Sequence, residues 1–127
     1  MGNFSRAIAP FVSAELQSAA QSMADGQAEI AFRCLERAHV LGQSATAQHV
    51  RVHWQMLRWG LAQRNLKEVF GQLFRLAGAA TKTAFGLVPE GNTGGANISP
   101  FKPLPIPAEL SEKIENAKNA SDVSHLK

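Results

Sequence analysis

Apolar residues recur every three or four positions through most of the first 86 residues, which is the spacing of one face of an α-helix. Proline is absent between Pro10 and Pro89, so nothing in this stretch forces a break. The pattern predicts a helix over 4–22, a second ending at Leu41, a third over about 45–64, and a fourth closing at Gly86.

Short polar and glycine signals separate these helices. Asp25 is expected to cap the second helix, Gly42 to end it, Ser44 to cap the third, and Asn65 to mark a tight corner before the fourth. The inward-facing residues are expected to be Phe11, Leu16 and Ala19 or Ala20 in the first helix; Ala28, Ala31, Leu35, Ala38 and Leu41 in the second; Val50, Trp54, Leu57 and Leu61 in the third; and Phe70, Leu73, Leu76, Ala77, Ala80, Ala84 and Phe85 in the fourth.

The composition changes after Gly86, where residues 87–107 read LVPEGNTGGANISPFKPLPIP and hold five of the six prolines. Such a segment cannot be a helix, yet it is too apolar for a free linker. It is expected to form an irregular, partly polyproline-like arm packed over the helices. Within this arm, the residues expected to turn the chain and tie its polar groups to the helices are Asn92, Thr93, Gly94, Gly95 and Asn97.

These elements predict an all-α fold, a four-helix bundle of antiparallel hairpins sealed by the Pro/Gly-rich arm. A single helical domain is expected over 1–110, arm included, with a short polar helix and a frayed tail over 111–127. The helices have a weak tetratricopeptide-like pattern, since Gly26, Ala31, Leu35 and Ala38 are echoed about 39 positions later.

Three of the four histidines lie within 15 residues of one another, at positions 39, 49 and 53. His49 and His53 are four apart on one predicted helix, so their rings project from the same face and can reach a single metal ion. Glu36 and His39 form an ExxH step on the preceding helix, the spacing found in carboxylate-bridged metal bundles. If the two helices are antiparallel, these four residues lie at compatible levels along the helix axes.

Convergence of the four is not assured by the helical wheel. His39 and Glu36 fall on the flank opposite His53 if the two apolar stripes face each other directly. A shared site then needs rotated helices, or a ligand from another helix such as Glu15, Glu29 or Glu68. The competing interpretation is structural: His49 and His53 are neutral residues at the edge of the core, hydrogen-bonded to carbonyl groups or to the arm.

Composition and charge exclude other classes of protein. The single cysteine, Cys34, rules out an internal disulfide framework and a CxxC zinc cluster, and favours a reducing, cytoplasmic setting. The N-terminus lacks the pattern of a secretory signal, and no apolar run approaches the roughly 20 residues that cross a bilayer. The formal net charge of +3 permits an anionic partner without requiring one.

Other candidate chemistry is weaker. The glycines of the GNTGGAN segment resemble a phosphate-binding loop, but the GK[ST] signature is missing and no helix follows. Arg51, Gln55 and Arg58 form a polar stripe near two tryptophans, which is more typical of a solvated face than of a nucleic-acid surface. No Ser-His-Asp or Cys-His constellation is present, so no catalytic residue is assigned.

The segments LERAHVLGQ, HVRVHWQMLRWG and VPEGNTGGANISPFKPLPIP together resemble the bacterial family known as domain of unknown function 3703, from about Gly26 to Leu110. The resemblance implies no established activity. It does imply an association with heavy-metal resistance genes, which favours the metal interpretation of the histidines.

The function expected from sequence is therefore binding of a divalent transition metal, most naturally zinc, with His49 and His53 as primary ligands and His39 and Glu36 as further candidates. The alternative is a tetratricopeptide-like interaction module that binds no metal and uses its histidines structurally. An unidentified protein or a second copy of the chain would be the partner, and neither nucleic acid nor a membrane is expected.

Overall fold

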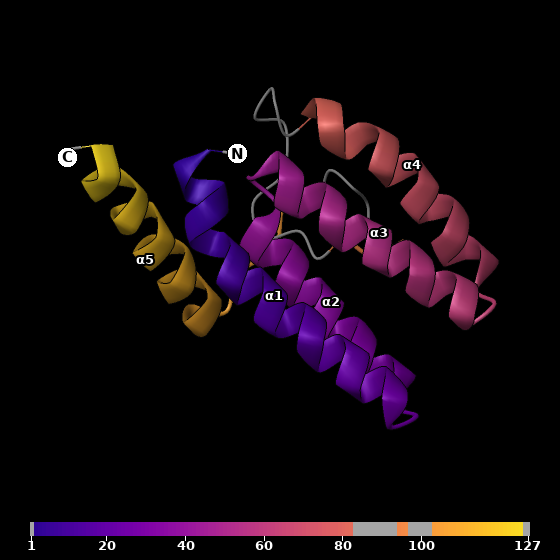
Figure 1. The fold of residues 1–127 in the computed structure, drawn as a ribbon. Coiled ribbons are helices and arrows are strands. Elements are labelled where there is room, and N and C mark those ends of the chain that lie inside the picture. The colour runs from indigo at the N-terminus through magenta and orange to yellow at the C-terminus, as the bar shows by residue number, and fades with distance from the viewer. Residues whose placement is uncertain (1, 83–93, 97–102, 126–127) are drawn as a thin grey trace.

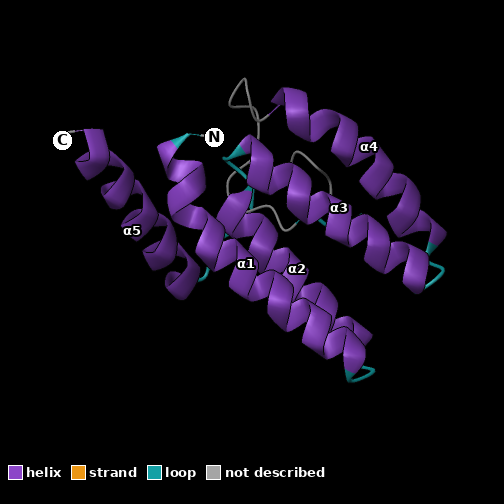
Figure 2. Cartoon of the chain, viewed as in Figure 1, coloured by secondary structure: helices purple, strands orange, loops and turns teal. Residues whose placement is uncertain are grey.

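The computed structural model describes residues 2–82, 94–96 and 103–125, apart from the side chains of 79–82, 124 and 125. In these residues the fold is all-helical, as predicted, with five helices and no strand. The helices are α1 (Asn3–Ala24), α2 (Ala28–Gly42), α3 (Thr46–Ala62), α4 (Leu66–Lys82) and α5 (Ala108–His125), and the described segments between them are turns and irregular chain (Figures 1 and 2).

The first four helices form two hairpins that meet through α2 and α3. Helix α1 packs along α2, α4 packs along α3, and α5 lies against the outer side of α1 (Figure 1). Of the described helices, α4 contacts only α3, so it lies at one edge of the molecule. Within the described residues, no helix is long and apolar enough to cross a membrane.

The core forms where α1, α2, α3 and α5 come together. Its largest fully buried apolar side chains are Ile8, Val12, Leu41, Val52, Met56 and Leu110. The stripe predicted for α2 is largely confirmed, because Ala31, Leu35, Ala38 and Leu41 are all buried. Burial of such a face supplies most of the stability of a short helix, which is marginal in water by itself.

Two of the predicted helix caps are wrong. Asp25 ends α1 rather than beginning α2: its backbone N–H bonds to the Gln21 carbonyl, and Gly26 then reverses the chain at a φ of +74°. Helix α3 is preceded by Ala45, not capped by Ser44. The corner at Asn65 is confirmed, since its side-chain oxygen accepts a hydrogen bond from the Glu68 backbone N–H at 3.0 Å and so caps α4.

The faces predicted for α3 and α4 are also wrong. Trp54 and Leu61 were expected to face inward but are 52% and 60% exposed. Helix α3 instead buries His49, Val52, His53, Met56 and Leu57. Of these, Leu57 was predicted to face inward, and that prediction is confirmed. On α4, Phe70 and Leu73 are exposed, while the polar Glu68 and Gln72 are buried. The periodic pattern shows which residues share a face of each helix. The contacts of the polar side chains decide which of these faces packs against the rest of the protein.

The C-terminal part of the chain contributes to the same core. Helix α5 continues through His125, where a frayed tail was predicted, and buries Leu110 and Ala117. Most of the predicted arm, including Asn92, Thr93 and Asn97, lies outside the described residues, as does the predicted end of the fourth helix at Gly86. Gly94 and Gly95 are described, and both are buried.

Candidate metal centre

A tight turn between α2 and α3 brings the three histidines together. His39 lies in the last turn of α2, and His49 and His53 lie one turn apart on the buried side of α3. Gly42, the last residue of α2, allows the two helices to meet closely, because a Cβ at this position would lie 2.9 Å from the Cβ of Gln48. All three imidazoles are buried, with 2% to 5% of each residue exposed.

The Nε2 atoms of the three histidines form a nearly equilateral triangle. The His39–His49 and His49–His53 separations are 3.0 Å, and the His39–His53 separation is 3.1 Å. The ring planes are inclined to one another by 47° to 71°, so the rings meet at their nitrogen edges and are not stacked. The geometry therefore directs three potential donor atoms to one point.

This triangle matches the size of a metal site. Zinc–nitrogen bonds of about 2.0–2.1 Å require ligand nitrogens roughly this far apart, so the three Nε2 atoms could hold one ion. A separation of about 3.3 Å would give tetrahedral angles, so a small outward movement of the rings is enough. Three ligands on one side of the ion leave at least one coordination position open.

Hydrogen bonding among the histidines cannot satisfy all three contacts of the triangle. Each Nε2 atom carries either a proton or a lone pair, so at least two of the three atoms must be alike. At about 3.0 Å, that pair places two N–H groups or two lone pairs against each other, which is repulsive. A cation that accepts all three lone pairs removes this repulsion.

Gln72 sets the proton position of His53. The Gln72 amide nitrogen donates to the Gly94 carbonyl at 2.9 Å, so the amide oxygen is the group that faces His53. That oxygen lies 2.5 Å from Nδ1 of His53 and requires an N–H there. In the neutral ring, Nε2 then carries the lone pair that points into the triangle, and a metal-binding histidine is held in this same way by an outer hydrogen bond.

Burial keeps His49 and His53 unprotonated. Desolvation, reinforced by His53, lowers the pKa of His49 from 6.5 to about 3. Desolvation also lowers the pKa of His53 to about 4, although the Gln72 hydrogen bond acts in the opposite direction. Both rings are therefore neutral at pH 7 and able to bind a metal without first losing a proton.

The described part of the arm lies directly against this cluster. Gly94 has a φ of +84°, and a Cβ there would lie 2.6 Å from Cγ and 2.8 Å from Nε2 of the His39 ring. Two residues later, the Ala96 N–H donates to the Glu68 carboxylate at 2.8 Å. The polar inner face of α4 thus holds the arm backbone, through Glu68 and Gln72, over the three histidines.

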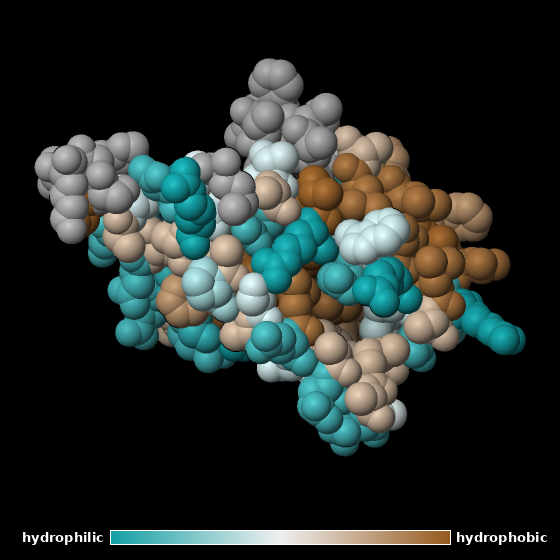
Figure 3. Space-filling view, in the orientation of Figure 1, coloured by the Kyte–Doolittle hydropathy of each residue, from teal (hydrophilic) through white to brown (hydrophobic). Residues whose placement is uncertain are grey.

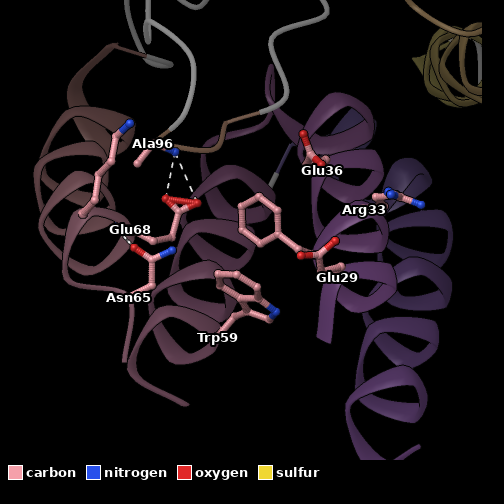
Figure 4. A pocket seen from close by; sticks show the side chains of 9 residues that line it. Glu29, Arg33, Glu36, Trp59, Asn65, Glu68 and Ala96 are labelled. Atoms are coloured by element: carbon pink, nitrogen blue, oxygen red, sulfur yellow. Dashed lines mark hydrogen bonds between the residues drawn. The ribbon is translucent and has the colours of Figure 1, made fainter. Parts of the chain in front are cut away.

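Glu36, the fourth ligand candidate, is not part of the histidine group. It lines a neighbouring pocket of about 280 Å³ together with Glu29, Trp59 and Glu68 (Figure 4). Of the other carboxylates that the sequence offers as ligands, Glu15 pairs with Arg37 at 2.9 Å. The structure therefore brings together His39, His49 and His53, and it places Glu15, Glu29, Glu36 and Glu68 in other contacts or in this pocket.

The sequence did not predict that Gln72 and Glu68 are buried beside the histidine cluster and the arm. A period-3.6 pattern with Phe70 and Leu73 inside assigns both to the solvent side of α4. No signal within α4 marks these roles, because both side chains bond to residues distant in sequence.

The two helical hairpins thus bring three buried histidines close enough together that they could hold a metal ion. The chain belongs to the family described as Protein of unknown function (DUF3703), whose model matches residues 6–114, as the sequence resemblance indicated. Neither the curated proteins nor the solved structures contain a match.

Proposed function

We propose that the protein binds one divalent transition-metal ion through the Nε2 atoms of His39, His49 and His53, with zinc as the expected ion. The observation that carries the proposal is the 3.0–3.1 Å triangle of these atoms, in which at least one contact cannot be a hydrogen bond and the spacing is close to the one a metal requires. Glu36 is not included among the ligands.

The surroundings favour a metal that accepts neutral nitrogen ligands. Three imidazoles suit zinc, copper, nickel or ferrous iron and do not suit magnesium or calcium, which prefer oxygen. The open coordination position can take water or a ligand from another molecule. Binding, storage or transfer of the metal is the role proposed, in agreement with the link to heavy-metal resistance that the family resemblance implies.

The test is metal content of the protein purified without a histidine tag, followed by zinc titration. Near-stoichiometric metal and a saturable, one-site titration are expected. A His49→Gln/His53→Gln double variant should lose both. His125→Gln, which removes the fourth histidine at the end of α5, is the matched control and should behave as wild type.

Spectroscopy distinguishes specific binding from loose association. Cobalt replaces zinc in such sites, and its visible absorption reports the coordination geometry. A strong d–d band in wild type and in His125→Gln, absent from the double variant, supports a three-histidine site. Equal titrations for wild type and the double variant would overturn the proposal.

A further inference from the structure

Helix α4 presents its polar side to the interior and its apolar side to solvent. Glu68 and Gln72 are 4% and 0% exposed, whereas Leu66 and Phe70 are 68% and 67% exposed. The polar side is held inside by the contacts of these two residues with His53 and the arm. An apolar helix face left in water in this way is unfavourable and marks an interaction surface.

The neighbouring helix α3, which packs along α4, also has large apolar side chains exposed. Figure 3 shows a broad apolar region on the side of the molecule formed by these two helices. We use the name outer hairpin face for the exposed large apolar side chains of α3 and α4, which are Trp54, Leu61, Leu66, Phe70, Leu73 and Phe74. Three aromatic and three leucine side chains are each at least half exposed, so the face exposes on the order of several hundred Å², the scale of the apolar patches that mark interaction sites.

The spacing of the exposed apolar residues along α4 is the one expected of a helix face that packs against another helix. Leu66, Phe70, Leu73 and Ala77 follow one another at intervals of four, three and four, the a/d spacing of a helix that pairs with a helix. The row is centred between Phe70 and Leu73. Two antiparallel copies of α4 related by a two-fold axis would therefore place Phe70 of each chain opposite Leu73 of the other.

We propose that the outer hairpin face is the interface of a homodimer, in which the α3–α4 hairpins of two copies form a four-helix arrangement. A second copy supplies a surface of equal area, equal apolar character and matching spacing. A membrane surface fits less well, because helices that lie on membranes carry several basic residues beside the apolar face. Of the basic residues of α4 whose side chains are described, Lys67 and Arg75, only Lys67 is exposed.

Analytical ultracentrifugation over a range of protein concentrations tests the proposal. Wild type should sediment with twice the 13.7 kDa mass of the chain, and a Phe70→Glu/Leu73→Glu variant should be monomeric with an unchanged helical circular dichroism spectrum. A Val123→Glu/Ile30→Glu variant adds the same two charges at exposed apolar positions on α5 and α2, and it should remain dimeric.

The antiparallel seam has its own test, in a Cys34→Ser background so that no native thiol competes. A mixture of Phe70→Cys and Leu73→Cys chains should form a disulfide-linked dimer in higher yield than either variant alone. Equal or lower yield from the mixture would contradict this register.

The dimer does not depend on the metal. It should persist in EDTA and in the His49→Gln/His53→Gln variant, so failure of one proposal leaves the other intact. A wild-type mass of one chain at every concentration would overturn the dimer. So would monomeric protein that binds phosphatidylcholine–phosphatidylglycerol vesicles through Phe70 and Leu73, since the face would then serve a membrane.

Discussion

Gly94 lies against the imidazole of His39, so closely that the glycine has no room for a side chain. A Cβ at this position would point into the ring, 2.6 Å from Cγ. The φ of +84° is also a conformation that residues with a side chain rarely adopt. The two observations together make Gly94 the point at which the arm is fitted to the histidine cluster.

Replacing Gly94 with alanine should weaken both the fold and metal binding. The left-handed backbone alone costs about 1–2 kcal/mol for a residue with a Cβ, and displacement of the His39 ring adds to this. Zinc affinity measured by competition with a chromophoric chelator should fall with the free energy of unfolding.

Gly26→Ala is the matched control for this substitution. Gly26 also has a positive φ, at +74°, but a Cβ there meets nothing within 4 Å. The control should lose stability of the same order from backbone strain and keep wild-type zinc affinity. Equal zinc affinities for the two variants would show that contact with His39 is unimportant for the site.

Replacing Gln72 with leucine should reduce zinc affinity by about 10–100-fold, the usual effect of removing an outer hydrogen bond to a metal ligand. The substitution leaves the His53 Nδ1–H without its acceptor at 2.5 Å and frees the ring to turn or change tautomer. Gln72→Glu retains an acceptor and should preserve more affinity than Gln72→Leu. Gln17→Leu, at an exposed position on α1, is the control. Unchanged affinity in Gln72→Leu would contradict a positioning role.

The metal-free protein should lose stability as the pH falls below about 6.5. The folded-state pKa values of His49 and His53, about 3 and about 4, lie below the ordinary value of 6.5. The unfolded chain therefore takes up protons that the folded chain does not, and stability is complete above pH 6.5 and declines toward pH 4. The slope should approach about 1.4 kcal/mol per pH unit for each histidine.

Urea unfolding at pH 7.5, 6 and 5 measures this dependence. The His49→Gln/His53→Gln variant lacks both groups and should show a flatter profile over the same range. Parallel profiles for wild type and the variant would mean that these histidines titrate normally in the folded protein.

Metal removal should lower the melting temperature. A ligand at 100 times its dissociation constant stabilises the folded state by about 2.7 kcal/mol, which corresponds to roughly 10 °C for a chain of this size. Zinc should raise the melting temperature of EDTA-treated wild type by this amount, and fresh EDTA should reverse the change. The absence of any shift in wild type, or an equal shift in the double histidine variant, would count against the site.

Much of the candidate site could be predicted because its spacing is local. His49 and His53 are one helical turn apart, and any helix over this segment places them on one face. The place of His39 depended on the angle between α2 and α3, which the close packing at Gly42 sets. Glu36 is only one turn from His39, yet it faces the neighbouring pocket, because a small difference in angle around the helix axis sends the side chain elsewhere.

The sequence by itself determined that the chain is helical, where most helices begin and end, and which residues of α2 are buried, because these depend on backbone propensity and on contacts within one or two turns. Only the tertiary structure decided which face of α4 is covered. Its apolar residues form the regular stripe that normally marks the core, but hydrogen bonds from Gln72 and Glu68 to residues distant in sequence hold the polar face inside. Such long-range contacts produce no periodic pattern in the sequence. The grouping of the three histidines and the exposure of the outer hairpin face therefore become visible only once the packing of the helices is known.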